Sequence, residues 1–141
     1  MLSGSLFAAG SCVQRGETDY VGVMGNTQRA YITLRCTGDG TIAAYTFNPA
    51  SFRVRGWYLY NITTNPGTSA PTASYDITLM VGDEDIAGGL LANRSATVNE
   101  TVVIAPTTLG YHMMDGSMVI TFAAETANPS TIDMTLRFTV N

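Results

Sequence analysis

The side chains that most often act as acids, bases, nucleophiles or metal ligands are scarce in this chain of 141 residues. It contains a single His, His112, only two Cys, and no Lys among its seven basic residues. A Ser/His/Asp hydrolase of the α/β class carries its Ser in the sequence G-x-S-x-G, which does not occur here. The phosphate-binding sequence G-x-x-x-x-G-K-[ST] requires a Lys. We therefore predict no catalytic residue, assign His112 no role, and expect that the protein is not an enzyme.

The one acidic cluster is Asp83-Glu84-Asp85, and its carboxylates are the kind of oxygen ligand that Ca²⁺ prefers. Counted from Asp83, the calcium-loop pattern of the EF-hand is met at its third position by Asp85. The pattern then fails at the fifth and twelfth positions, which are Ala87 and Arg94. We therefore expect a solvated turn at this place, and we predict no metal ion and no cofactor.

Cys12 and Cys36 are too few for a tetrahedral zinc site, and His112 does not complete one by its spacing. The two could form one disulfide. However, Cys12 lies in the N-terminal segment and Cys36 at the end of a predicted strand. The expectation is therefore two free thiols, buried or half-buried.

Residues 1–17 are rich in Gly, Ser and Ala and are predicted to be a flexible N-terminal arm. The small residues before Cys12 are compatible with a signal peptide or lipoprotein anchor. Both normally need a positive charge near the N-terminus, and no basic residue precedes Arg15. Leu2 and Phe7 have no local apolar partners, so we predict that they dock onto a neighbouring molecule.

A second partner-binding surface is predicted from Arg53, Arg55 and Trp57. In a strand these three residues share one face. Arg and aromatic residues are enriched at interface hot spots, and an Arg stacks well on an aromatic ring.

The elements that must position these residues are strands. Apolar and polar residues alternate along most of the chain, most clearly between Ile132 and Val140. Gly, Pro, Asn and Asp separate the runs, and 37–40 has the composition of a tight hairpin turn. Gly88-Gly89 argues against a helix of more than one turn at 86–96. The predicted strands are 19–24, 30–36, 41–47, 52–63, 75–81, 101–105, 117–124 and 132–140.

About eight short strands predict an all-β protein, an antiparallel β-sandwich or barrel that occupies residues 18–141 as one domain.

Only 13% of the residues are charged, the net charge is −4, and Thr occurs 20 times. No apolar stretch approaches the 18 residues of a membrane span. A pI of 4.6 and the absence of a basic run disfavour binding to nucleic acid. Such a weakly charged surface favours contact with other proteins.

From Arg53 onward the chain carries an aromatic strand, the loop P-G-T-x-x-P-T, the strand Tyr75-Asp76-Ile77-Thr78-Leu79, and the segment from Gly88-Gly89 to Asn93-Arg94-Ser95; the loop residues are Pro66, Gly67, Thr68, Pro71 and Thr72. With these features the stretch resembles a small β-structural protein of tailed-bacteriophage virions. The resemblance implies a capsid decoration (cement) protein with a jelly-roll-like fold. The implied partner is the major capsid protein, and the implied assembly is a homotrimer on the capsid surface.

Two alternatives stay open. The first is a tail or neck adaptor or a fibre-associated protein of the same virion. The second is a carbohydrate-binding β-sandwich on the virion surface, in which exposed Trp57 and Tyr58 line the sugar site. An enzyme such as a depolymerase would require Asp83 or Glu84 to meet a distant carboxylate in a deep cleft.

Overall fold

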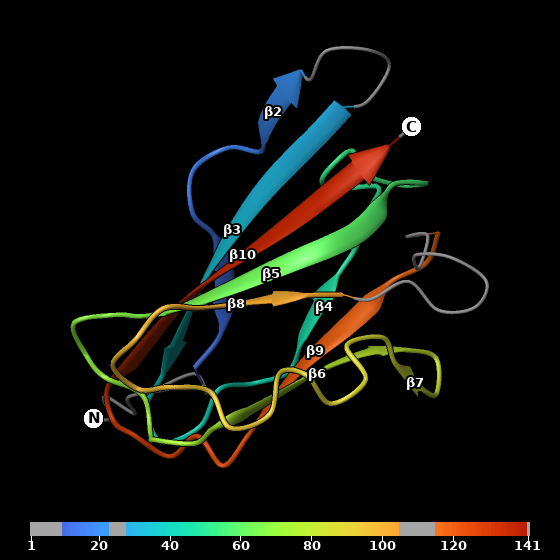
Figure 1. Cartoon of the computed structure of the whole chain (residues 1–141). Helices are drawn as coiled ribbons and strands as arrows, with labels where there is room; N and C mark the ends of the chain where they lie inside the picture. The colour runs from blue at the N-terminus through green and yellow to red at the C-terminus, as the bar shows by residue number, and fades with distance from the viewer. Residues whose placement is uncertain (1–9, 23–27, 105–114, 141) are drawn as a thin grey trace, which may run out of the picture.

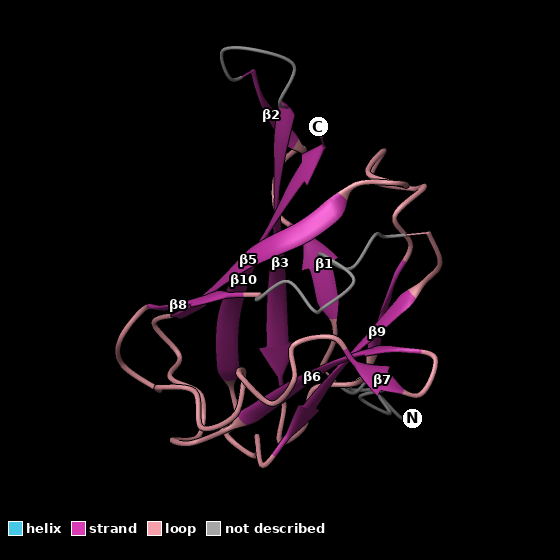
Figure 2. Ribbon diagram, turned by 45° about the vertical axis from the view of Figure 1, so that its right-hand side comes forward, coloured by secondary structure: helices cyan, strands magenta, loops and turns pink. Residues whose placement is uncertain are grey.

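The chain folds into strands joined by turns and loops (Figures 1 and 2). The computed structural model describes residues 10–22, 28–104 and 115–140. Within these ranges no helix is long and apolar enough to cross a membrane. The ten strands are β1 (Cys12–Gln14), β2 (Asp19–Gly22), β3 (Gln28–Gly38), β4 (Tyr45–Phe47), β5 (Tyr58–Pro66), β6 (Asp76–Val81), β7 (Glu84–Asp85), β8 (Glu100–Val103), β9 (Met118–Ala123) and β10 (Ser130–Val140).

The strands form two antiparallel sheets. The larger sheet has six strands in the order β1-β3-β10-β5-β8, with β2 also paired to β3. The smaller sheet has the order β4-β9-β6-β7. From β3 to β10 the chain passes repeatedly between the sheets, and only the β6–β7 hairpin stays within one. This order of eight strands is that of a jelly roll built from two Greek keys. The predicted all-β, jelly-roll-like sandwich is therefore confirmed.

The core lies between the inner faces of the two sheets. Ile132, Met134, Leu136 and Phe138 of β10 point inward and are fully buried, and apolar residues of β3, β6 and β9 are buried beside and opposite them. Phe47 of the smaller sheet stacks on Phe138 of the larger one, with ring centroids 5.6 Å apart. Phe52 stacks on the other side of Phe47 at 4.6 Å. Burying each such ring contributes roughly 1.5–3 kcal/mol, so this stack helps hold the layers together.

A strand overlaps each of the eight predicted ranges, although β5 begins at Tyr58 and not at Phe52, and residues 23, 24 and 105 of these ranges lie outside the described residues. The turn at 37–40 is not a hairpin. It connects β3 of the larger sheet to β4 of the smaller one. Gly40 has a φ of 108°, and its N–H donates to the carbonyl oxygen of Ala127 at 3.2 Å. Asp-Gly sequences allow a sharp reversal of the chain, and whether the two strands then pair depends on which neighbours they find. Here both edges of β3 are already occupied, by β10 on one side and by β1 and β2 on the other.

Tyr75 is fully buried, and its hydroxyl makes no hydrogen bond to another described residue. Burial raises the pKa of Tyr75 from its usual 10.0 to about 12. The folded protein therefore retains this proton between about pH 10 and pH 12, whereas the unfolded chain releases it, so the free energy of unfolding falls as the pH rises through this range.

We predict that Tyr75→Phe leaves the free energy of unfolding at pH 7 within about 1 kcal/mol of the wild-type value, because no hydrogen bond is lost. The variant should also resist alkaline unfolding better than the wild type. Urea unfolding at pH 7 and pH 11 measures both effects. A loss above about 2 kcal/mol at pH 7 would show that the hydroxyl has a stabilising partner.

Candidate interaction surfaces

Arg53, Arg55 and Trp57 do not share a strand face, so that prediction is wrong. Residues 48–57 form successive turns, in which the N–H of Arg53 donates to Ala50 and that of Trp57 donates to Val54. β5 begins only at Tyr58. Apolar Phe52 and Val54 alternate with polar residues, which is the pattern of a strand. Both side chains instead pack inward from a turn, and a φ of 60° at Arg53 turns the chain back.

The three predicted residues differ in their surroundings. Arg53 and Arg55 are exposed, and Arg55 pairs with Asp115 at 3.3 Å on the protein surface. Trp57 is half-buried against the core, with its ring edge-on to Tyr20 at 6.2 Å between centroids. Their role in partner binding stays a prediction. Leu2, Phe7 and His112 lie outside the described residues.

An open groove of about 300 Å³ lies beside this loop. The hydroxyl of Tyr20 donates to the carbonyl oxygen of Phe52 at 3.3 Å and so links β2 to the loop. The groove is lined by Glu17, Thr18, Tyr20, Ser51, Phe52 and Arg53.

The sugar-binding alternative requires Trp57 and Tyr58 to be exposed. Both side chains are half-buried.

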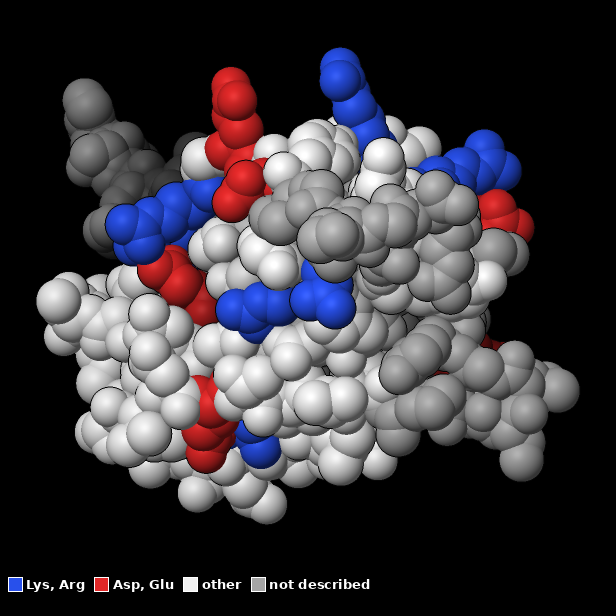
Figure 3. Space-filling model, turned by 45° about the horizontal axis from the view of Figure 1, so that its top comes forward, with Lys and Arg blue, Asp and Glu red and all other residues white. Residues whose placement is uncertain are grey.

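The outer face of the larger sheet carries a row of four Thr. Thr33, Thr135, Thr63 and Thr101 are register partners on β3, β10, β5 and β8. The hydroxyl oxygens of Thr33 and Thr135 lie 3.1 Å apart, and those of Thr63 and Thr101 lie 2.9 Å apart. These short uncharged side chains lose little conformational entropy on burial, which suits a surface that contacts another protein. In Figure 3, most of the visible surface that belongs to described residues is likewise uncharged.

Beside the Thr row lies a group of four residues, Arg29, Tyr31, Tyr60 and Arg137, which we call the Arg–Tyr cluster. The Arg29 guanidinium lies over the Tyr60 ring at 5.4 Å, and that of Arg137 lies over the Tyr31 ring at 5.5 Å. Burial raises the pKa of Tyr60, and the neighbouring Tyr31 hydroxyl adds to this shift. The cluster joins two hot-spot residue types on one face.

A β-bulge explains how Tyr60 reaches this cluster. The register between β5 and β10 shifts between Arg137 and Phe138, so Tyr60 has no partner on β10. Such a bulge re-aims side chains and increases the local twist. Arg137 also donates hydrogen bonds to Asn61 Oδ1, at 2.7 Å, and to Thr63 Oγ1. Among the described residues, its guanidinium is therefore held by neutral groups.

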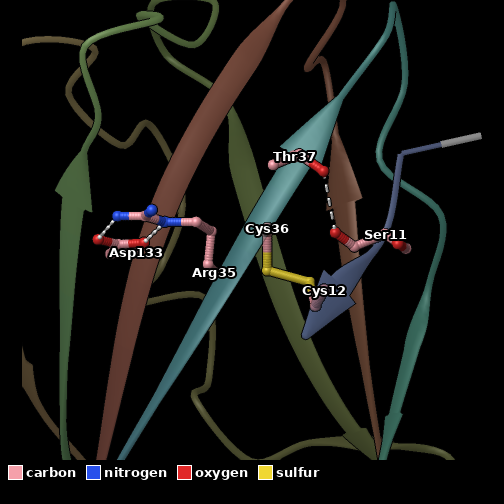
Figure 4. The surroundings of a disulfide bond; sticks show 6 residues. All are labelled: Ser11, Cys12, Arg35, Cys36, Thr37 and Asp133. Atoms are coloured by element: carbon pink, nitrogen blue, oxygen red, sulfur yellow. Dashed lines mark hydrogen bonds and ion pairs between the residues drawn. A yellow bond between two sulfur atoms is a disulfide. The ribbon is translucent and has the colours of Figure 1, made fainter. Parts of the chain in front are cut away.

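Asp133 lies at the other end of the same face and binds two Arg side chains. Arg35 donates from Nε and Nη2 at 2.9 and 3.1 Å, and Arg15 donates from Nη1 at 2.7 Å (Figure 4 shows the Arg35 pair). The hydrogen bond from Arg35 is the largest cause that lowers the pKa of Asp133, and the nearby positive charges of both Arg side chains lower it further. The carboxylate thereby ties the segment after β1 to β3 and β10.

Cys12 and Cys36 form a disulfide, so the expectation of two free thiols is wrong. They are register partners on β1 and β3, and β1 extends the sheet at the edge of β3 (Figure 4). The carbonyl oxygen of Ser11 also accepts a hydrogen bond from the N–H of Thr37 at 3.0 Å. The pairing of β1 with β3 and the disulfide anchor β1, so the larger sheet begins within the predicted arm of residues 1–17. Residues 1–9 of this arm lie outside the described ranges.

The acidic cluster is more ordered than the solvated turn that we predicted. Gly82 has a φ of 60° and turns the β6–β7 hairpin. The carboxylate of Asp85 accepts hydrogen bonds from the N–H groups of Leu79, Ala87 and Gly89, at 3.0, 3.2 and 3.0 Å. Its oxygens are thus used to organise the turn. In the part of the chain that the structure describes, no three His, Cys, Asp or Glu side chains come together as a metal site.

Comparison with models of known protein families and with curated proteins gives no match. Among solved structures, the chain is similar to one described as the cyanophage Pam1 capsid asymmetric unit. The sequence identity is 15%, the TM-score is 0.42, and the alignment covers 100% of both chains. A similarity this low carries no assignment of function.

We predict that Asp133→Asn lowers the free energy of unfolding at pH 7 by about 1–2 kcal/mol, because charge-assisted hydrogen bonds are lost. The pKa of Asp133 is lower in the folded protein than in the unfolded chain, where it is near 4. Asp133 therefore stabilises the protein at pH values above the unfolded pKa, and this stabilisation is lost as the pH falls through the folded-state pKa. The variant should therefore lose less stability than the wild type between pH 5 and pH 2, as measured by urea unfolding.

Asp115→Asn is the matched control, because it breaks the Arg55 pair, whose side chains are 68% and 72% exposed. This change should cost below about 0.5 kcal/mol. Equal effects of the two substitutions would contradict the structural role of Asp133.

We predict that replacing both Cys by Ala lowers the free energy of unfolding by about 3 kcal/mol, the value typical for a disulfide that closes a loop of this length, 24 residues. Thermal unfolding with and without dithiothreitol is the measurement. Reduction should lower the Tm of the wild type and leave that of the double variant unchanged. A wild-type Tm that is insensitive to reduction, with full reduction verified by thiol titration, would contradict this prediction.

Proposed function

We propose that this protein is a structural component of a phage virion that binds the outside of the capsid as an oligomeric decoration protein. The proposal rests first on the residues that resemble a virion protein, and the jelly-roll order of the strands is compatible with it. Jelly rolls also occur in lectins and cupins, so the fold alone does not select this function.

The observation that carries the proposal is the outer face of the larger sheet. It combines the uncharged Thr row with the Arg–Tyr cluster. Interfaces are enriched in Tyr and Arg and depleted in Lys, and the chain has no Lys. A sheet face of this kind suits a protein whose task is to cover and bridge other subunits, without catalysis.

A homotrimer is the assembly that we propose. The larger sheet ends in β8 at one edge, where Val103 is 60% exposed, and in β1 at the other, where Val13 is 60% exposed. Edges that pair with no further strand of the described ranges, and that carry exposed apolar residues, favour contacts with further chains, and a closed ring of copies covers them.

The test is to measure the solution mass of the purified protein and its binding to purified capsids that lack it. We expect a trimer that saturates the capsid with many copies distributed over the whole shell. Removal of residues 1–9 should weaken binding if the arm docks through Leu2 and Phe7, while the trimer mass is unchanged.

A monomer that does not bind capsids would contradict the proposal. A copy number that corresponds to a single ring would instead identify a neck or tail component. A stably folded preparation, verified by a cooperative thermal transition, is the control for both measurements.

A further inference from the structure

We propose that the Arg–Tyr cluster is the place at which the outer face recognises carboxylate side chains on an acidic surface of the capsid protein. This inference rests on the proposed function and adds to it the surface that binds and the chemistry of its partner. The argument uses the charge of this face, the availability of its Arg side chains and the shape of their surroundings.

The outer face is basic, although the chain as a whole has a net charge of −4. Arg29, Arg35 and Arg137 project from its strands, and Arg15 adds a fourth positive charge from the segment after β1. The strand carboxylates on the same face are Asp133, opposite Arg35, and Asp19, opposite Tyr31. The strands of this face thus carry three Arg and two carboxylates, so their net charge is positive and complements an acidic partner.

The Arg side chains of this face fall into two pairs that differ in availability. Arg15 and Arg35 are already neutralised by Asp133. Among the described residues, Arg29 and Arg137 contact no carboxylate. Two guanidinium groups thus have positive charge available for an external anion, and both belong to the Arg–Tyr cluster.

The neutral neighbours of Arg137 hold its side chain in place before any partner arrives. Asn61 and Thr63 accept its hydrogen bonds, and the Tyr31 ring lies beneath its guanidinium. A side chain that is already ordered loses less conformational entropy on binding, which raises its contribution to affinity. The planar guanidinium can also donate two parallel hydrogen bonds to one carboxylate.

The surroundings favour a protein partner over nucleic acid. The Thr row gives the cluster a neighbouring surface of short uncharged side chains, which a folded partner can cover. Single-stranded nucleic acid binds by stacking bases on open aromatic faces, whereas the Tyr31 and Tyr60 rings are each covered on one side by an Arg.

The test compares three variants of the full chain. Arg29→Gln removes one exposed charge of the cluster, and Arg29→Gln/Arg137→Gln removes both of its charges. Thr41→Glu/Thr46→Glu is the matched control, because it lowers the net charge by the same two units at exposed positions on the β3–β4 connection and on β4, away from the outer face of the larger sheet. Circular dichroism and the Tm verify the fold of each variant. Arg29→Gln keeps the test valid if the double variant is unstable, because Arg29 is exposed.

Binding is measured to three probes at 50 and 500 mM NaCl: capsids lacking the protein, poly-L-glutamate, and a single-stranded oligonucleotide. We expect Arg29→Gln to weaken binding to capsids and to poly-L-glutamate about threefold, and the double variant to weaken it about tenfold or more. The control variant should bind like the wild type, and high salt should reduce wild-type binding.

Wild-type binding to capsids that is unchanged by either cluster variant would overturn this inference and leave the decoration function standing. Loss of poly-L-glutamate binding in the cluster variants, without any capsid binding by the wild type, would support the carboxylate site and contradict the decoration function. Poly-L-glutamate binding that is absent, or equally reduced by the control variant, would overturn the site. Tighter cluster-dependent binding to the oligonucleotide than to poly-L-glutamate would overturn the choice of a protein partner.

Discussion

The pairing of β10 with both β3 and β5 is the constraint on which the rest of the structure depends. β10 matches β3 over eleven residues, from Ser130 opposite Gly38 to Val140 opposite Gln28, and this register fixes which residues point inward. Because side chains alternate along a strand, a slip by one residue would expose the apolar row and bury the polar one. A single alignment thus determines both the core and the outer face.

The two faces of β10 have separate tasks. Its inner row packs against the smaller sheet and closes the sandwich through the contact between Phe47 and Phe138. Its outer row contributes Asp133, Thr135 and Arg137 to the ion pairs, the Thr row and the Arg–Tyr cluster. The ion pairs and the disulfide secure the N-terminal edge of the sheet. The surface that we propose for binding is therefore supported by the same strand that organises the core.

Alternation of apolar and polar residues was enough to predict eight of the ten strands that the structure describes, because it reflects burial of one face. It could not reveal β1 and β7, which have three and two residues and owe their pairing to neighbours distant in the chain. The disulfide could not be predicted for the same reason, because it depends on the pairing of β1 with β3. The Arg–Tyr cluster joins residues from β3, β5 and β10 through a bulge. The sequence points instead to Arg53 and Arg55 as partner-binding residues, because neighbours in the sequence can be recognised without knowledge of the fold.

The central claim is that the outer face of the larger sheet is the face that contacts the capsid. A cryo-electron microscopy reconstruction of capsids decorated with this protein tests it most directly. The account predicts that β3, β10 and β5 face the shell, with Arg29 and Arg137 beside acidic residues of the capsid protein. Density in which this face points away from the shell, while the smaller sheet or the 48–57 loop makes the contact, would contradict it.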